Sequence, residues 1–144
     1  MDYKRILAAF CALVMISLPS FGRAEDRAAE LLAELQEAET ATAAQRLESQ
    51  IIAEWSKSGS ASMDLLLKRG RDALEVKNHK AAIEHFRALT DHAPEFAEGW
   101  HGLALAYFGA EKFGPAMDAL ERVLALNPNH FAALRGVGAI NEQV

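Results

Sequence analysis

The sequence is short of cysteine, proline and positive charge, and each shortage narrows what the chain can be. Its 144 residues contain one cysteine, so no disulfide forms within the chain, and only four prolines. The net charge of −5 argues against a general nucleic-acid-binding protein, which would carry a basic stripe. Runs of β-branched residues are nearly absent while alanine fills 28 positions, which disfavours an extensive β-sheet. The length allows one domain, or one small domain and a removable segment.

The N-terminal segment is typical of a secretory signal peptide. It has a basic start, an apolar run, and small residues at positions −3 and −1 of a cleavage site: Lys4 and Arg5, Ile6–Leu18, and Gly22 and Ala24. The apolar run is shorter than the ~20 apolar residues that span a bilayer. Cys11 follows the large Phe10, whereas a bacterial lipoprotein needs a small residue before its modified cysteine.

We therefore expect residues 1–24 to be cleaved and the protein to be exported, to the periplasm if the source is a Gram-negative bacterium. No stable membrane span would remain after cleavage. The mature chain would have no cysteine and would carry 12 basic and 19 acidic side chains.

The rest of the chain repeats with a fixed period, which is the spacing between Pro94 and Pro128. Other matching positions are Ala82 and Ala116, Phe86 and Leu120, Leu89 and Val123, Leu66 and Trp100, and the series Gly70, Ala104 and Gly138. A period of this length indicates stacked supersecondary units, each of which buries its apolar face against the next.

The period and the residue types resemble the tetratricopeptide repeat (TPR), a helix–turn–helix unit of about 34 residues. The residues that carry the resemblance are Trp100, Leu103, Ala104 and Tyr107, which fit the pattern W-x-x-L-G-x-x-Y with alanine for glycine, and Ala116, Leu120 and Pro128 in the second helix. The preceding repeat departs from the pattern at Arg69 and Ala73. The resemblance implies an all-α superhelix (an α-solenoid) over residues 63–144, with repeats at 63–96 and 97–130 and a partial repeat at 131–144.

Small residues, prolines and glycines predict how these helices pack and end. Gly70, Ala82, Ala104 and Ala116 stand where helix backbones would approach closely. Helices should stop before Pro94 and Pro128, because the residue before proline resists the α-helical region. Gly114-Pro115 predicts a helix with proline at its first position.

Residues 25–62 predict a separate helical hairpin. The first helix, residues 26–38, has Leu31, Leu32 and Leu35 on one face. Thr42 and Gln45 resemble a capping box at the start of the second helix, whose apolar residues are Leu47, Ile51, Ile52 and Trp55. Residues 56–62 then break the chain. The hairpin is either a degenerate repeat or a cap on the N-terminal end of the array.

No motif for catalysis, cofactor binding or metal binding is present. The sequence has no P-loop, no GxSxG elbow, no HExxH and no cysteine pair. The five histidines, His79, His85, His92, His101 and His130, never fall four residues apart, so we interpret them as solvated or interface residues. We expect no catalytic residues, no cofactor and no metal, and therefore no enzyme.

What remains is a binding surface. The resemblance implies that the first helices of successive repeats line a concave groove, with Lys68, Arg71, Leu74, Glu98, His101, Leu105, Phe108 and Arg135 facing inward. The basic members suggest an acidic ligand or a C-terminal carboxylate, although an ordinary solvated face explains them equally well.

The sequence predicts an adaptor or scaffold of the cell envelope that binds a peptide or helix of a protein partner and no nucleic acid. The alternative is a structural protein that self-associates as a homo-oligomer. Leu134, Val137 and Ile140 of the last helix would then form an uncovered interface.

Overall fold

The computed structural model describes residues 21–144 and is all-α over that range, as predicted. Its seven helices are α2 Phe21–Gln36, α3 Ala41–Trp55, α4 Ala61–Glu75, α5 His79–His92, α6 Ala97–Gly109, α7 Phe113–Leu126 and α8 Phe131–Asn141. The apolar run of the expected signal peptide and Cys11 lie outside the described residues.

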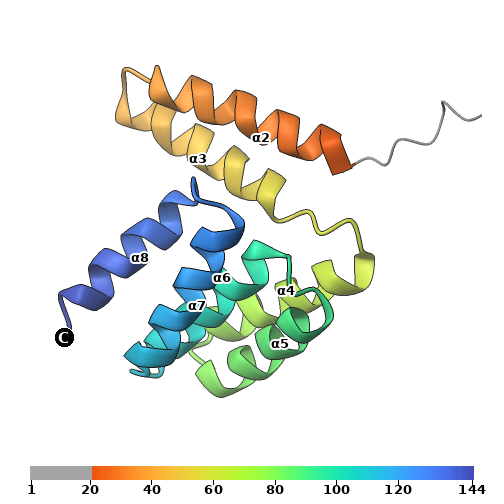
Figure 1. Cartoon of the computed structure of the whole chain (residues 1–144), viewed down its shortest axis with the longest axis vertical. Helices are drawn as coiled ribbons and strands as arrows, with labels where there is room; N and C mark the ends of the chain where they lie inside the picture. The colour runs from red at the N-terminus through yellow and green to blue at the C-terminus, as the bar shows by residue number, and fades with distance from the viewer. Residues whose placement is uncertain (1–20) are drawn as a thin grey trace, which may run out of the picture.

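Helices α4 to α8 form a stack in which each helix packs against the next (Figure 1). The alternate helices α4, α6 and α8 are also neighbours and form one layer of the stack. Two core clusters follow from this arrangement: one around Phe86 and Leu89 of α5, and one around Leu120 and Val123 of α7.

The turn from α4 to α5 and the turn from α6 to α7 lie one period apart and have the same backbone conformation. Lys77 has φ 57° and Glu111 has φ 58°. In both turns the next amide donates to a carbonyl five residues back, Asn78 N to Ala73 O at 2.8 Å and Lys112 N to Tyr107 O at 2.9 Å. The bond satisfies a carbonyl at the end of the helix, which is how left-handed C-caps work. The backbone conformation therefore repeats with the same period as the sequence.

Glycines let the helices of the stack approach one another. The ring of Phe86, fully buried, lies between Gly70 of α4 and Gly102 of α6, and a Cβ at either glycine would overlap it. One period later, Leu120 faces Gly136 in the same way, with a Cβ position 3.1 Å from its side chain. The predicted close-packing alanines, Ala82, Ala104 and Ala116, are buried. Gly138 completes the predicted series, but a Cβ there would meet no atom within 4 Å.

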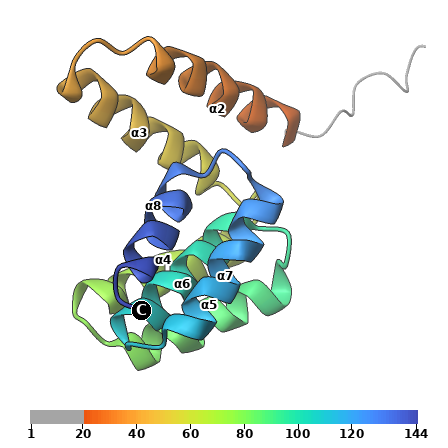
Figure 2. The ribbon, with the colours of Figure 1, turned by 60° about the vertical axis from the view of Figure 1, so that its left-hand side comes forward.

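Helices α2 and α3 form a hairpin with a small core of its own, which contains the predicted residues Leu31, Leu47 and Ile51. Within residues 21–144, α3 does not pack along α4 as α5 packs along α6. It lies instead beside the start of α8, where Trp55 contacts Phe131 (Figures 1 and 2). The hairpin therefore does not continue the stacking of α4–α8.

Several helix ends differ from the predictions. Helix α2 spans Phe21–Gln36 rather than 26–38. The N-cap of α3 is Thr40, whose hydroxyl accepts from the Ala43 amide at 3.2 Å, so the capping box at Thr42 is wrong. Helix α7 begins at Phe113, which makes Pro115 its third residue rather than its first. Proline is tolerated there because amides of the first turn lack helical partners. The predicted stops before Pro94 and Pro128 are confirmed, with Ala93 and Asn127 as C-caps.

Helix α8 is less exposed than the sequence suggested. Ile140 is 3% exposed in the core shared with α7, and Val137 is half-buried against it, so the prediction of a fully uncovered face is wrong. Leu134 alone of the three is exposed, at 54%.

Candidate functional site

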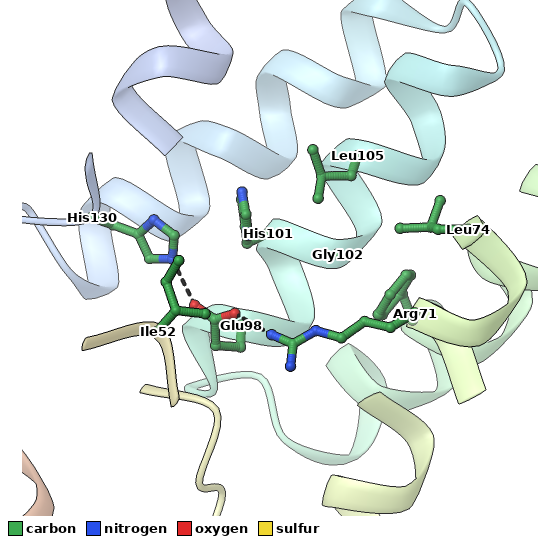
Figure 3. Close-up of a pocket in the computed structure, with 9 residues that line it drawn as sticks. Ile52, Arg71, Leu74, Glu98, His101, Gly102, Leu105 and His130 are labelled. Carbon is green, nitrogen blue, oxygen red and sulfur yellow. Dashed lines mark hydrogen bonds and ion pairs between the residues drawn. The ribbon is translucent and has the colours of Figure 1, made fainter. Parts of the chain in front are cut away.

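Two adjoining hollows follow the inner face of α6. The first, about 220 Å³, lies between α3, α4, α6 and the start of α8 (Figure 3), and its lining residues are Ile52, Arg71, Leu74, Phe86, Glu98, His101, Gly102, Leu105 and His130. The second, about 110 Å³, lies between α6 and α8, and its lining residues are His101, Ala104, Leu105, Phe108, Leu120, Gly136, Ala139 and Ile140. His101 and Leu105 border both hollows, which therefore adjoin along α6, and we call the two together the α6 groove.

The structure brings six of the eight predicted groove residues together. Arg71, Leu74, Glu98, His101 and Leu105 line the first hollow, and Phe108 lines the second. Lys68 and Arg135 line neither hollow. Lys68 pairs with Asp72 of its own helix at 2.7 Å, and Arg135 pairs with Glu48 of α3 at 3.3 Å.

A buried carboxylate ties the walls of the groove together. Glu98 of α6 is 2% exposed, and its two oxygens accept from different elements: Oε2 from Arg71 Nη2 of α4 at 2.8 Å and Oε1 from His130 Nε2 at 2.7 Å. Burial raises the pKa of Glu98, but the His130 hydrogen bond, together with the electrostatic effects of His101, His130 and Arg71, outweighs it, and the pKa lies below its usual value. Glu98 is therefore an ionised link between α4, α6 and α8.

The hydrogen bonds of His130 fix its tautomer. His130 is the N-cap of α8, and its Nδ1 lies 3.1 Å from the Ala133 amide, which can only donate. Nδ1 is therefore unprotonated, and the ring hydrogen is on Nε2, where it donates to Glu98. His130 is 1% exposed and stacks on Trp55 of α3, so of the two predicted alternatives, a solvated or an interface histidine, the solvated one is wrong for this residue.

His101 adds a neutral ring to the same cluster. Its centroid is 4.7 Å from that of His130. Burial lowers the pKa of His101 to about 4 despite the attraction of the Glu98 charge. The residue is therefore uncharged at neutral pH and contributes an aromatic surface to the groove.

Glu98, His101 and His130 place three potential metal ligands within 4.8 Å of one another. Their hydrogen bonds oppose a cation there. His130 Nε2 carries a hydrogen and offers no lone pair while Nδ1 caps α8, and the Arg71 guanidinium already neutralises Glu98. The donor set fits a hydrogen-bonded link between helices better than a metal centre.

Comparison with known proteins adds the family. Residues 73–139 match the tetratricopeptide repeat family. A TPR repeat-containing protein of Rhizobium etli is 31% identical over 116 residues, which are 81% of this chain and 57% of that protein. The chain therefore matches tetratricopeptide repeats within residues 73–139. It spans little more than half the length of this relative.

TPR proteins are in general protein–protein interaction modules and are typically non-catalytic. Among the described residues, no helix is both long enough and apolar enough to cross a membrane. In TPR terms, α4, α6 and α8 are the first helices of their units, and the α6 groove lies on the layer that they form.

The hydrogen bond between Glu98 and His130 in the α6 groove was not predicted from the sequence, although the sequence contains part of its signal. Glu98 and His101 are three residues apart and so share one face of a helix, a spacing that a search limited to histidine pairs does not detect. His130 lies one period after Phe96, and both are N-caps of first helices. The remaining signal was that His130 is polar at a position where the preceding repeat has the aromatic Phe96.

The charges in and near the groove are balanced within the chain. Lys68, Arg71 and Arg135, which were expected to attract an acidic ligand, each pair with a carboxylate of this protein. Between these pairs the groove surface is apolar, formed by residues such as Leu74, Leu105 and Phe108. This surface suits apolar side chains better than a carboxylate.

Proposed function

We propose that the chain is an exported, non-enzymatic TPR adaptor of the cell envelope that binds a peptide or helix of a protein partner in the α6 groove. The observation that carries the proposal is the exposure of the Leu105 side chain within the groove. This leucine is 45% exposed and stands between the two hollows, so apolar surface and accessible volume coincide. Concave, mostly apolar surfaces with a few polar groups are where proteins bind ligands.

The paired charges favour an apolar contact over recognition of a terminal carboxylate. To receive a carboxylate, Arg71 would have to leave Glu98, which is 2% exposed and would then be a buried charge with one partner fewer. An apolar side chain beside Leu105 and Phe108 requires no such exchange.

The groove is organised before a ligand arrives. Glu98 joins α6 to α4 through Arg71 and to the start of α8 through His130, so the three helices that line the groove are fixed relative to one another. A preformed site loses less conformational entropy on binding than one that must be ordered.

Export is part of the proposal and rests on the sequence. The basic start, the apolar run and the small residues before Glu25 have the order of a signal peptide. Self-association through α8 is the alternative, but Leu134 is the only exposed large apolar residue that α8 offers, and we favour the groove.

Selection of displayed random peptides on the full chain tests the groove. Leu105→Asp places a charge at the centre of the groove, and Val76→Asp, at a residue 75% exposed beyond the end of α4, is the matched control. We expect peptides selected on the wild-type chain to lose at least tenfold in affinity for Leu105→Asp and to retain it for Val76→Asp. Equal affinity for the two variants would contradict the proposal.

A further inference from the structure

We propose that helix α3 occupies one end of the α6 groove in place of a partner, and that the partner is a helix with the same surface pattern. The pattern is an acidic residue, an aliphatic residue four positions later, an aromatic residue three further on and then a small polar residue, as in Glu48, Ile52, Trp55 and Ser56. This inference rests on the proposed function and names the class of partner.

Glu48, Ile52 and Trp55 lie on one face of α3, Ser56 is its C-cap, and each of the four contacts the stack. Glu48 accepts from Arg135 of α8, and Ile52 lines the first hollow. Trp55 stacks on His130 with ring centroids 4.8 Å apart and an interplanar angle of 24°. Ser56 Oγ, just after the helix, accepts from Arg71 Nη2 at 3.0 Å. Positions i, i+4, i+7 and i+8 share one side of a helix, so α3 is docked as an amphipathic ligand would be.

The hairpin is separable from the stack. Leu47 and Ile51 of α3 pack on α2 with Leu31, so the hairpin loses Phe131 but keeps these contacts of its core if α3 leaves the groove. Residues 56–60 link α3 to α4 without helix–helix packing, and Gly59 there has φ 78°. Apart from Phe131 of α8, which packs against the hairpin core, the contact depends on a few side chains of α3, and a competing helix that offers the same side chains can displace it.

The groove also extends beyond α3. Of the two hollows, α3 lines only the first, through Ile52, and the second continues between α6 and α8 past Phe108. A partner helix that repeats the contacts of α3 and adds an apolar residue at Phe108 would bury more surface than α3 does. That difference would favour the partner over the internal helix.

Competition between the internal helix and the same helix added in trans tests the inference. The probe is a fluorescent peptide of residues 41–57, titrated with the full wild-type chain and with a chain carrying Ile52→Ala and Trp55→Ala. We expect the peptide to bind the double variant at least tenfold more tightly, because the internal competitor is weakened. A peptide carrying the same two substitutions should bind neither chain. Equal affinity of the wild-type peptide for both chains would overturn the inference.

A charge exchange keeps the test independent of hairpin folding. Adding Arg135→Glu to the double variant should weaken binding of the wild-type peptide, and a Glu48→Lys peptide should restore it. Arg135 is exposed and outside the cores, so the substitution leaves the stack intact. Peptide binding indifferent to Arg135→Glu would overturn the proposed register. If the Leu105→Asp selection succeeds and this competition fails, the groove still binds a partner and only the role of α3 is wrong.

Discussion

The α4–α8 stack and the α2–α3 hairpin are held by different kinds of contact. In the stack, large apolar side chains enter spaces that glycine leaves in neighbouring helices, as Phe86 does at Gly70 and Gly102. Between hairpin and stack, the contacts are made by single side chains: Trp55 packs on His130 and Phe131, Ile52 lines the first hollow, and Glu48 and Ser56 add an exposed ion pair and a hydrogen bond. Interdigitated cores couple helices into one cooperative unit, whereas exposed polar contacts add little each. We therefore expect damage to the stack to be global and damage to the hairpin contact to stay local.

The largest expected effect is that of Phe86→Ala. The ring is fully buried between two glycines that cannot fill the cavity it would leave. Truncation of such a residue costs about 3–5 kcal/mol, a large part of the stability of a small domain. Urea unfolding followed by circular dichroism should show the loss in one transition. Phe86→Leu is the control, because it reproduces the Leu120–Gly136 contact of the next unit and should cost clearly less. Equal losses for the two variants would contradict packing against glycine as the cause.

The next effect is acid destabilisation of the stack through His101. Burial holds its pKa at about 4, against 6.5 for the ordinary side chain. Between those values the unfolded chain binds a proton that the folded chain does not, so the stabilisation present above pH 6.5 is lost as the pH falls toward 4. From pH 7 to pH 5 the free energy of unfolding should drop by about 2 kcal/mol from this residue. The measurement is urea unfolding at both pH values.

His101→Leu is the matched variant for that measurement. Leucine suits the apolar walls of both hollows and does not titrate. The drop between pH 7 and pH 5 should shrink by about the same 2 kcal/mol in the variant. The pKa of Glu98 is lowered from 4.5, so its linkage operates below this pH window and does not obscure the result. An unchanged pH dependence would show that His101 is not the responsible group.

The packing of the stack was well predicted from the sequence, because equivalent positions in successive repeats make equivalent contacts. Phe86 and Leu120, one period apart, are equivalent core residues, as expected. Gly102 and Gly136 are also one period apart and face those two residues, yet the predicted series of small residues, Gly70, Ala104 and Gly138, contains neither of them. The left-handed turns at Lys77 and Glu111 could not be predicted, because neither residue is a glycine or asparagine that would mark such a conformation.

The packing of the hairpin was harder to predict, because an apolar pattern indicates which residues are buried but not which helix they pack against. Trp55 was predicted to be a core residue, and it does contact other aromatic rings. An apolar face on α3 would look the same whether it packed on α4 or on the start of α8. Whether α3 packs on α4 or on the start of α8 depends on residues 56–60 and on His130. These residues lie far apart in the sequence, and no local pattern connects them.

The smallest effect isolates the hairpin contact. Glu48→Gln removes the exposed ion pair with Arg135, whose side chain is 62% exposed, and such pairs contribute less than about 1 kcal/mol. Global unfolding should therefore be almost unchanged. Amide hydrogen exchange in α3 should speed up by a few fold while exchange in α5 and α7 stays constant, because only the docking of the hairpin is weakened. Asp72→Asn is the control, since it breaks another exposed pair, Lys68–Asp72, within one helix of the stack and should leave α3 unaffected. If Glu48→Gln accelerates exchange in α5 as much as in α3, the hairpin and the stack open as one unit, and the distinction between them fails.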